Sequence, residues 1–263
     1  MNLTLLNKSD LSILNKRSLK YRLADAEKDY LLSVVAKIIY ESPLRDKLVF
    51  KGGTAIHHCY LPQTRFSEDL DFTSLDKAVT LEDIKAVLEA CDFLEVKEDY
   101  VSKATIKIER LKYSGPLALP GSLKVEIDFV QNVVLPAKTM IYKNAWQVDA
   151  SVKVMDIKEI CAEKIRATSD RARFRDFYDL VLLFDKFKPA VEEIAGLIKK
   201  KEIRNSIAAD LISDNWTRVK TEREAELSRV YYAKEINDSM VKTIINAFKP
   251  FLPIGRQDTG ETS

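Results

Sequence analysis

Short apolar runs and alternating patterns predict four strands in the first 130 residues. These strands cover residues 48–50, 67–72, 103–113 and 122–130. Successive side chains of a strand point to opposite faces of a sheet. Asp69 and Asp71 therefore share one face of their strand, and Glu126 and Asp128 share one face of theirs. The pattern places two pairs of carboxylates on strand faces.

Apolar residues at helical spacing predict helices between and after these strands. The predicted helices cover residues 24–40, 54–60, 80–91, 156–168, 175–187, 189–201 and about 220–248, with short helical pieces before residue 24. In the first long helix, Glu27, Lys28 and Asp29 are assigned to the polar side. Thr80 and Asp83 have the spacing of a capping box that opens the helix after them.

The pattern becomes almost wholly helical after about residue 155. We therefore predict a mixed α+β protein with two domains. An α/β domain with N-terminal helices covers residues 1–150, and an all-helical domain covers residues 151–263. The polar stretch 255–263 is expected to be frayed.

Composition is that of a globular protein with a real core, since 46% of the 263 residues are hydrophobic and 31% are charged. A net charge of +2 excludes strong whole-molecule attraction to nucleic acid but allows a local basic face. Cys59, Cys91 and Cys161 lie far apart without a CxxC pair, which favours reduced thiols. With no apolar run near ~18 residues and no signal-peptide pattern, we expect a cytoplasmic protein without a membrane partner.

The aspartates of residues 67–72 have the spacing of a metal site. Asp69 and Asp71 lie about 7 Å apart along a strand, so both can reach one Mg²⁺ or Mn²⁺ ion or two neighbouring ions. Glu126 and Asp128 are the candidates for a third carboxylate. Such a set suits nucleotidyl or phosphoryl transfer from a nucleoside triphosphate (NTP). The alternative is that Asp-x-Asp is a common tripeptide in turns.

A pair of adjacent glycines, Gly52 and Gly53, follows a short apolar run and opens a predicted helix. The chain has only seven glycines, which favours a backbone requirement at this point. Backbone N–H groups at such a turn can approach a phosphate closely. A tight strand-to-helix turn without a ligand is the alternative.

These motifs together resemble one known family. A glycine turn, a short helix and a strand with Asp-x-Asp are similar to the minimal nucleotidyltransferase fold of the DNA polymerase β superfamily. More narrowly, the segments KGGTA (51–55) and RFSEDLDF (65–72) resemble the signature of the AbiEii/AbiGii toxin nucleotidyltransferases. EKDY (27–30), EKIRA (163–167) and RDFYDL (175–180) resemble further motifs of that family. The resemblance covers residues 27–184.

The resemblance implies a nucleotidyltransferase-type mixed sheet flanked by helices and followed by a helical domain. It assigns the triphosphate to Lys51, Gly52, Gly53, Thr54, Ser67 and Lys164, the metal to Asp69 and Asp71 with Glu126 or Asp128, and catalytic roles to Asp69, Asp71, Glu126, Lys164, Asp176 and Asp179. The helical domain would bring its lysine and aspartates to the cleft. Some relatives transfer a nucleotide to the 3′ end of tRNA as toxins of toxin–antitoxin or abortive-infection systems.

Several of these residues have a plainer interpretation. Lys164 and Asp176 could form a surface ion pair, and Asp179 could be solvated. Lys51 and Arg65 could steer phosphate or lie in solvent.

Other motifs are also open to two interpretations. His57 and His58 could suggest a metal, but adjacent helical side chains diverge by about 100°. The run 199–201 with Arg204, together with residues 216–220, could face RNA. The alternative is a solvated helix end and a tryptophan in the core.

The expected function is therefore Mg²⁺-dependent transfer of a nucleoside monophosphate from an NTP to an acceptor, with tRNA or another RNA as the candidate acceptor and a cognate antitoxin as a candidate partner. Three alternatives stay open: the same chemistry on a protein or small molecule, an NTP-binding module that sequesters a partner, and a helical interaction protein.

Overall fold

The computed structural model describes residues 3–201, 205–227 and 231–254. It divides the chain into two compact units. The first contains residues 1–131 and 137–155, and the second contains residues 132–136 and 156–263. The chain therefore passes from the first unit to the second, returns, and passes to the second again.

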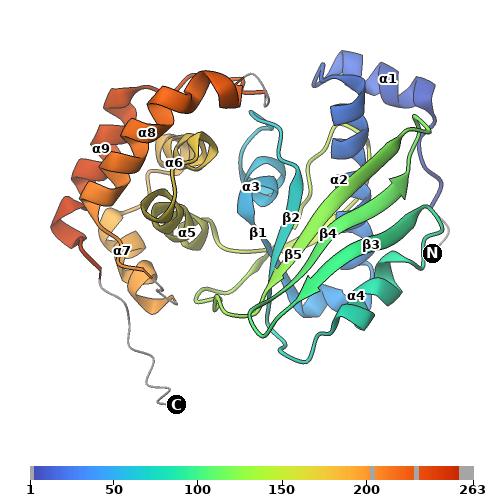
Figure 1. Ribbon diagram of the computed structural model, residues 1–263, viewed down its shortest axis with the longest axis horizontal. Helices are drawn as coiled ribbons and strands as arrows, with labels where there is room; N and C mark the ends of the chain where they lie inside the picture. Colours follow the sequence, from blue (N-terminus) through green and yellow to red (C-terminus); the bar gives the residue numbers. More distant parts are fainter. Residues whose placement is uncertain (1–2, 202–204, 228–230, 255–263) are drawn as a thin grey trace. The chain divides into compact units, whose positions relative to one another are not determined.

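A seven-stranded mixed sheet forms the centre of the first unit (Figure 1). Its strands are β1 (Leu48–Lys51), β2 (Asp69–Ser74), β3 (Leu94–Val101), β4 (Thr105–Ser114), β5 (Pro120–Asp128), β6 (Lys138–Ile141) and β7 (Ser151–Val154). They follow the order β3-β4-β5-β2-β1-β7-β6. Strand β2 pairs antiparallel with β1 and parallel with β5, which confirms the predicted mixed sheet. The sequence pattern missed β3, β6 and β7.

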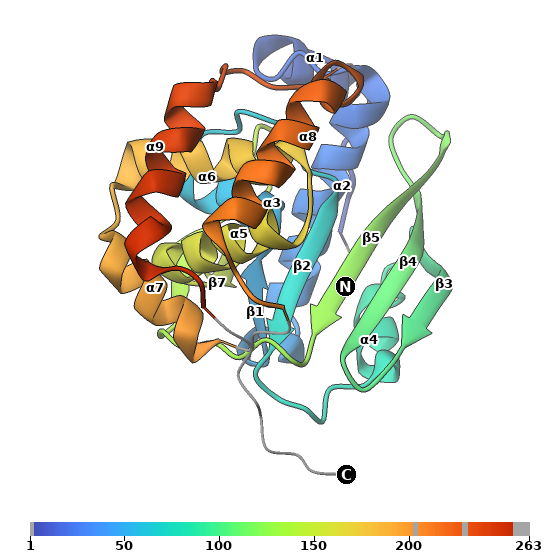
Figure 2. The same ribbon diagram turned by 60° about the vertical axis from the view of Figure 1, so that its left-hand side comes forward.

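Helices α1 (Lys8–Arg17), α2 (Leu23–Tyr40) and α4 (Leu81–Leu88) complete the first unit, with α3 (Gly52–Ala55) directly after β1. A π-helical turn, Ile56–Tyr60, extends α3. Helices α2 and α4 lie against one face of the sheet (Figure 2). Apolar residues of the strands face these helices, so Phe50 and Phe72 pack with ring centroids 5.3 Å apart. The polar residues of β2 and β5 are left on the other face.

Helix α2 is buried on nearly all sides, so the predicted polar side is wrong for Glu27 and Asp29. Both carboxylates have partners that offset the cost of burial. Glu27 accepts a hydrogen bond from the backbone N–H of Leu117 at 2.6 Å, and burial raises its pKa even so. The predicted capping box is confirmed, because Thr80 and Asp83 bond reciprocally at the start of α4.

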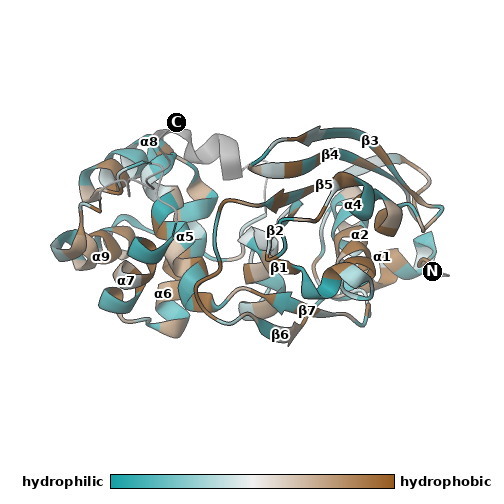
Figure 3. Cartoon of the chain, turned by 90° about the horizontal axis from the view of Figure 1, so that it is seen from below, coloured by the Kyte–Doolittle hydropathy of each residue, from teal (hydrophilic) through white to brown (hydrophobic). Residues whose placement is uncertain are grey.

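The second unit is built from helices α5 (Ile157–Asp170), α6 (Phe174–Phe187), α7 (Val191–Lys200), α8 (Ala209–Leu227) and α9 (Asp238–Phe248). These helices carry both hydrophilic and hydrophobic residues, teal and brown in Figure 3, as amphipathic packing requires. The single helix predicted over about 220–248 is wrong, since residues 231–237 between α8 and α9 are not helical. The predicted frayed stretch 255–263 lies outside the described residues.

Trp216 of α8 belongs to the core of the second unit. Its ring lies 5.1 Å from that of Phe177 and stacks on Phe174 at 6.3 Å, and only 4% of the residue is exposed. Its indole N–H donates to Asp238 at 2.9 Å. The interpretation of Trp216 as a core residue is confirmed, and an RNA-stacking role for it is wrong.

Candidate active site

Strand register brings the predicted carboxylates together on one face of the sheet. Asp71 of β2 lies opposite Lys51 of β1 on one side and opposite Glu126 of β5 on the other. Residues opposite each other in neighbouring strands point to the same face. Lys51, Asp71 and Glu126 therefore share a face, and Asp69 and Asp128 join it by the alternation along their own strands.

The glycine turn lies directly against this face. Gly52 has a φ of +76°, and a Cβ built on it would lie 2.9 Å from Asp71 Cγ and closer still to Oδ2. A Cβ on Gly53 would lie 2.9 Å from Ser67 Oγ and closer still to the Arg65 guanidinium. Any larger residue at either position would push these groups away. The turn, the Asp71 carboxylate and Ser67 thus form one contiguous surface.

Thr54 anchors the aspartate strand to the turn. Its hydroxyl donates to the main-chain carbonyl of Asp69 at 2.5 Å, and the residue is fully buried. The hydroxyl is therefore engaged within the fold, and the group that Thr54 can offer a phosphate is its backbone N–H. An N–H in the first turn of a helix has no partner within the helix.

Helix α2 fixes the loop that leads into β2. Asp29 accepts hydrogen bonds from Gln63 Nε2 at 2.6 Å and from Trp146 Nε1 at 2.8 Å. Lys28 pairs with Glu68, immediately before β2, at 3.2 Å. The EKDY segment thus positions the loop before β2. The sequence analysis missed this role because it placed these residues on the polar side of the helix.

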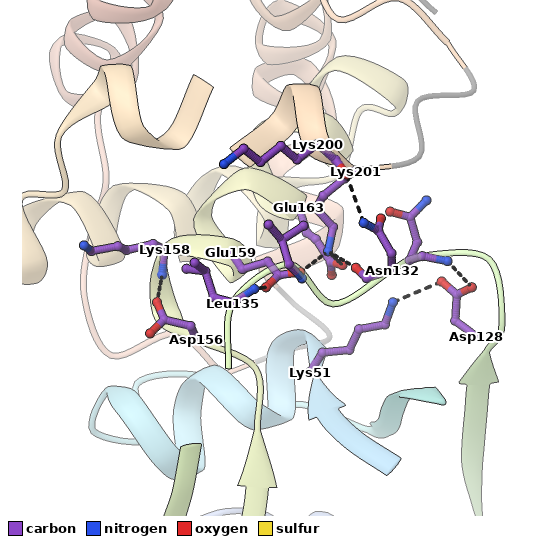
Figure 4. A network of polar contacts seen from close by, with 12 residues as sticks. Lys51, Asp128, Asn132, Leu135, Asp156, Lys158, Glu159, Glu163, Lys200 and Lys201 are labelled. Carbon is purple, nitrogen blue, oxygen red and sulfur yellow. Dashed lines mark hydrogen bonds and ion pairs between the residues drawn. The ribbon is translucent and has the colours of Figure 1, made fainter. Parts of the chain in front are cut away.

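The two candidates for the third carboxylate have different surroundings. Asp128 Oδ2 pairs with Lys51 at 3.0 Å (Figure 4). Its Oδ1 accepts the backbone N–H groups of Val130 and Gln131 at 2.8 and 3.1 Å. Burial opposes ionisation of Asp128, but Lys51 and these N–H groups outweigh it and hold the pKa below its usual value. Both carboxylate oxygens of Asp128 are therefore already engaged in contacts within the protein.

Glu126 is the more accessible carboxylate. Its side chain is 44% exposed, and Lys107 of the neighbouring strand approaches it at 3.3 Å. It also lies beside Asp71 in the ladder, whereas Asp128 lies opposite Thr73. The geometry therefore favours Glu126 over Asp128 as a group that can act on a ligand.

The strand carboxylates suit a metal ion only in combination with a substrate. Among the described residues, no group of three or more His, Cys, Asp or Glu side chains is gathered closely enough to hold an ion. Two carboxylates on one strand face with a third beside them do suit Mg²⁺, which takes one or two carboxylates and completes its shell with water and substrate phosphate. Asp69 and Asp71 are the residues that fit this role.

The lysine and aspartates of the helical unit form a buried cluster. Lys164 Nζ lies 2.9 Å from Asp176 Oδ1 and 2.8 Å from Asp179 Oδ2, and both aspartates are at most 1% exposed. Arg171 Nε adds a second contact to Asp176 at 2.8 Å. Burial disfavours the Asp176 carboxylate, but Lys164 and Arg171 prevail and hold its pKa well below the usual value. The plainer interpretations as a surface ion pair and a solvated aspartate are wrong.

Another lysine, Lys201, is also buried. It pairs with Glu159 at 2.5 Å and Glu163 at 3.0 Å (Figure 4). Glu159 in turn accepts the N–H groups of Val134 and Leu135, each at 3.0 Å. This network ties the 132–136 segment to the second unit, so Lys201 is not part of an RNA-facing run. Arg204 lies outside the described residues.

The adjacent histidines belong to the core of the first unit. His57 and His58 are at most 1% exposed. His58 Nδ1 lies 2.7 Å from the carbonyl of Lys143, and its ring stacks on Tyr142 at 4.3 Å. Their metal interpretation has no support in the part of the chain that the structure describes.

A glycine turn packed against an Asp-x-Asp strand, in a mixed sheet of this order, defines a nucleotidyltransferase. The sequence matches the family model described as nucleotidyl transferase AbiEii toxin, type IV toxin–antitoxin system, over residues 34–251. This chain therefore belongs to the AbiEii nucleotidyltransferase toxin family.

A solved structure supports the same fold. MenT4, a nucleotidyltransferase toxin from Mycobacterium tuberculosis H37Rv, superposes with a TM-score of 0.59 at 18% identity, over 94% of this chain and 100% of the MenT4 chain. No curated protein sequence matches this chain. Within the described residues, no helix has the length and apolar character needed to cross a membrane.

Proposed function

We propose that this toxin transfers a nucleoside monophosphate from an NTP to the 3′ end of an RNA acceptor such as tRNA, in an Mg²⁺-dependent reaction. The observation that carries the proposal is the contact of Gly52 with the Asp71 carboxylate. It joins a carboxylate that suits a metal to the first turn of a helix, where backbone N–H groups have no partner within the helix. A triphosphate and its counter-ion need those two groups side by side.

In this reaction the acceptor hydroxyl oxygen forms a bond to the α-phosphorus, and the bond from that phosphorus to the bridging oxygen breaks to release pyrophosphate. Gly52, Gly53 and Ser67 bind the phosphates, with Lys51 adding positive charge beside them. Asp69 and Asp71 hold Mg²⁺, which neutralises the phosphate charge when bound. Glu126, exposed beside Asp71, takes the proton of the attacking hydroxyl.

In this proposal Lys164 also contacts the triphosphate, a role that the resemblance of its EKIRA segment to the AbiEii family motif implies. Asp176 and Asp179 fix its ammonium group from two sides, so that it is ordered before substrate binds. Preorganised charge of this kind stabilises a transition state without reorganisation. A Lys164→Arg variant should then raise the KM for NTP more than the KM for RNA.

Membership of a toxin–antitoxin family implies a cognate antitoxin as partner. A protein or small-molecule acceptor is the second candidate for the nucleotide. Sequestration of a partner without transfer is the third, and the presence of both aspartates with Lys164 argues against it.

One experiment separates these candidates. The protein is incubated with each α-³²P-labelled NTP, Mg²⁺ and total tRNA. The same reactions are run with Asp69→Asn/Asp71→Asn and with a matched control, Asp210→Asn/Asp214→Asn, which neutralises two exposed aspartates of α8. Label on tRNA that disappears only in the first variant supports the proposal. Label on protein supports the second candidate, and NTP binding without any label supports sequestration.

A further inference from the structure

A basic cavity opens on the outer strands of the sheet, away from the glycine turn. It has a volume of about 380 Å³ and lies on β3, β4 and the start of β5. Its lining consists of Lys97, Arg110, Lys112 and the segment Pro120, Gly121 and Ser122. Three of these six residues are cationic and none is acidic; Glu95 and Glu98 lie beside the cavity on β3.

The cavity faces the same side of the sheet as the catalytic carboxylates. Lys112 lies opposite Ser122 in the β4–β5 ladder, so both point to one face. Ser122, Lys124 and Glu126 alternate along β5 and share that face. The distance from Ser122 to Glu126 along the strand is about 13 Å. Both ends of this path lie on one continuous sheet within the first unit.

A bulge in β4 turns Arg110 toward the cavity. The register shifts between Ile108 and Leu111. Two consecutive β4 residues, Glu109 and Arg110, therefore lie opposite a single residue of β5, and both can point to the same face. Glu109 forms an ion pair with Lys124 at 3.0 Å. Arg110 has no ion-pair partner among the described residues, which leaves its guanidinium available to a ligand.

The chemistry of the lining fits phosphate groups. A guanidinium offers a planar fork of donors that matches phosphate oxygens, and a lysine adds a mobile positive charge. Lys97 and Lys112 both pair with Glu95, Lys112 at 4.0 Å, and pairs so exposed are weak enough to exchange for a phosphate. The Ser122 hydroxyl is a further donor at the same place. Contacts of this kind fix the register of a nucleic-acid backbone without reading its sequence.

We infer that this cavity binds backbone phosphates of the RNA acceptor and leads its 3′ end along β5 toward Glu126 and Asp71. The inference rests on the proposed function, because it takes the acceptor to be RNA. A phosphodiester strand is favoured over an acidic protein because the cavity shares its face with the groups that act on the acceptor hydroxyl.

The test compares Arg110→Ala/Lys112→Ala with Lys16→Ala/Arg17→Ala. The control removes the same two residue types from exposed positions of α1. Binding of total tRNA is measured without NTP over a range of salt concentrations, and transfer is measured separately. The cavity variant should raise the KM for RNA at least tenfold, with kcat and the KM for NTP within twofold of wild type. Its plot of log affinity against log salt should be shallower by about 0.7 to 0.9 for each phosphate that the variant no longer neutralises.

The outcomes are distinguishable. An unchanged RNA KM and salt slope in the cavity variant, with transfer to RNA intact, overturns the inference and leaves the proposed function standing. RNA binding that depends on the cavity, without transfer by the wild type, overturns the proposed function and supports the cavity as an RNA site. Impaired antitoxin binding with unchanged RNA binding overturns the inference in favour of a protein partner. Circular dichroism on each variant checks that the fold is retained, and Lys97→Ala provides a milder second variant.

Discussion

Gly52 lies against the carboxylate of Asp71, with no room between them for a methyl group. Gly52 directly follows β1, and Asp71 lies in the neighbouring strand β2. Their contact places the backbone of the glycine turn beside the carboxylate assigned to the metal. The positive φ of Gly52 makes this approach available only to glycine without strain.

A Gly52→Ala substitution should therefore damage both stability and activity. The new Cβ must displace Asp71 and adopt a strained φ, which costs at least about 1 kcal/mol of unfolding free energy. A shift of the carboxylate by ~1 Å should lower kcat by about 100-fold. Denaturant unfolding and steady-state kinetics measure the two effects.

Gly196→Ala is the matched control. Gly196 lies inside α7, and a methyl group there would meet no atom of the described residues within 4 Å. This variant should keep full activity and gain about 0.5–1 kcal/mol of stability, because alanine is the better helix former. Equal activity in both variants would contradict the importance of the Gly52–Asp71 contact.

Glu126→Gln and Asp128→Asn should have opposite effects. Glu126 is exposed beside Asp71, so its replacement should lower kcat by about 100-fold or more and leave the melting temperature unchanged. Asp128 holds Lys51 and a backbone turn, so Asp128→Asn should lose about 2 kcal/mol of stability. The reverse pattern, with Asp128→Asn impairing chemistry at unchanged stability, would assign the third carboxylate to Asp128.

Lys164→Met should destabilise the helical unit strongly. It leaves Asp176 and Asp179 buried without the ammonium group between them, which costs about 3–5 kcal/mol. Lys158→Met, on the same helix, breaks an exposed pair with Glu193 and should change stability little. Urea unfolding followed by circular dichroism compares them. Similar midpoints for the two variants would mean that the buried cluster adds no stability.

The pH dependence of unfolding should report Asp176. Its pKa in the folded protein lies below the ordinary value of about 3.9, so its ionised form stabilises the fold above that pH. This contribution disappears as pH falls from about 5 through the lower folded pKa. Asp176→Asn should therefore show a shallower loss of stability than wild type between about pH 5 and pH 2. Parallel curves in urea titrations at several pH values would contradict the lowered pKa.

Sequence patterns predicted the parts of the fold that local chemistry determines. Alternation placed Asp69, Asp71 and Glu126 on strand faces, and strand register then brought them together. The capping box at Thr80 followed from two side chains three residues apart. The resemblance to the AbiEii family, carried by short motifs, was confirmed by the family model.

Contacts with residues far away in the sequence determined several features that the sequence patterns did not predict. Asp29 looked like a surface residue because nothing in its helix reveals that Gln63 and Trp146 will satisfy it. Lys201 looked like part of a basic run, but Glu159 and Glu163 draw it into the interior. Strand β3 was missed because most of its residues are exposed at the edge of the sheet, where a burial pattern is weak. The errors at Asp29 and Lys201 concern long-range contacts that no local pattern contains.

The measurement that tests the central claim most directly is the fate of the two ends of the triphosphate. Wild type and Asp71→Asn are incubated with Mg²⁺, tRNA and NTP labelled with ³²P at either the α or the γ position. Nucleotidyl transfer predicts that wild type moves only the α label to RNA, releases the γ label as pyrophosphate, and that Asp71→Asn loses both signals. Transfer of the γ label, or wild-type transfer by Asp71→Asn, would contradict a reaction carried by the glycine turn and the aspartate strand.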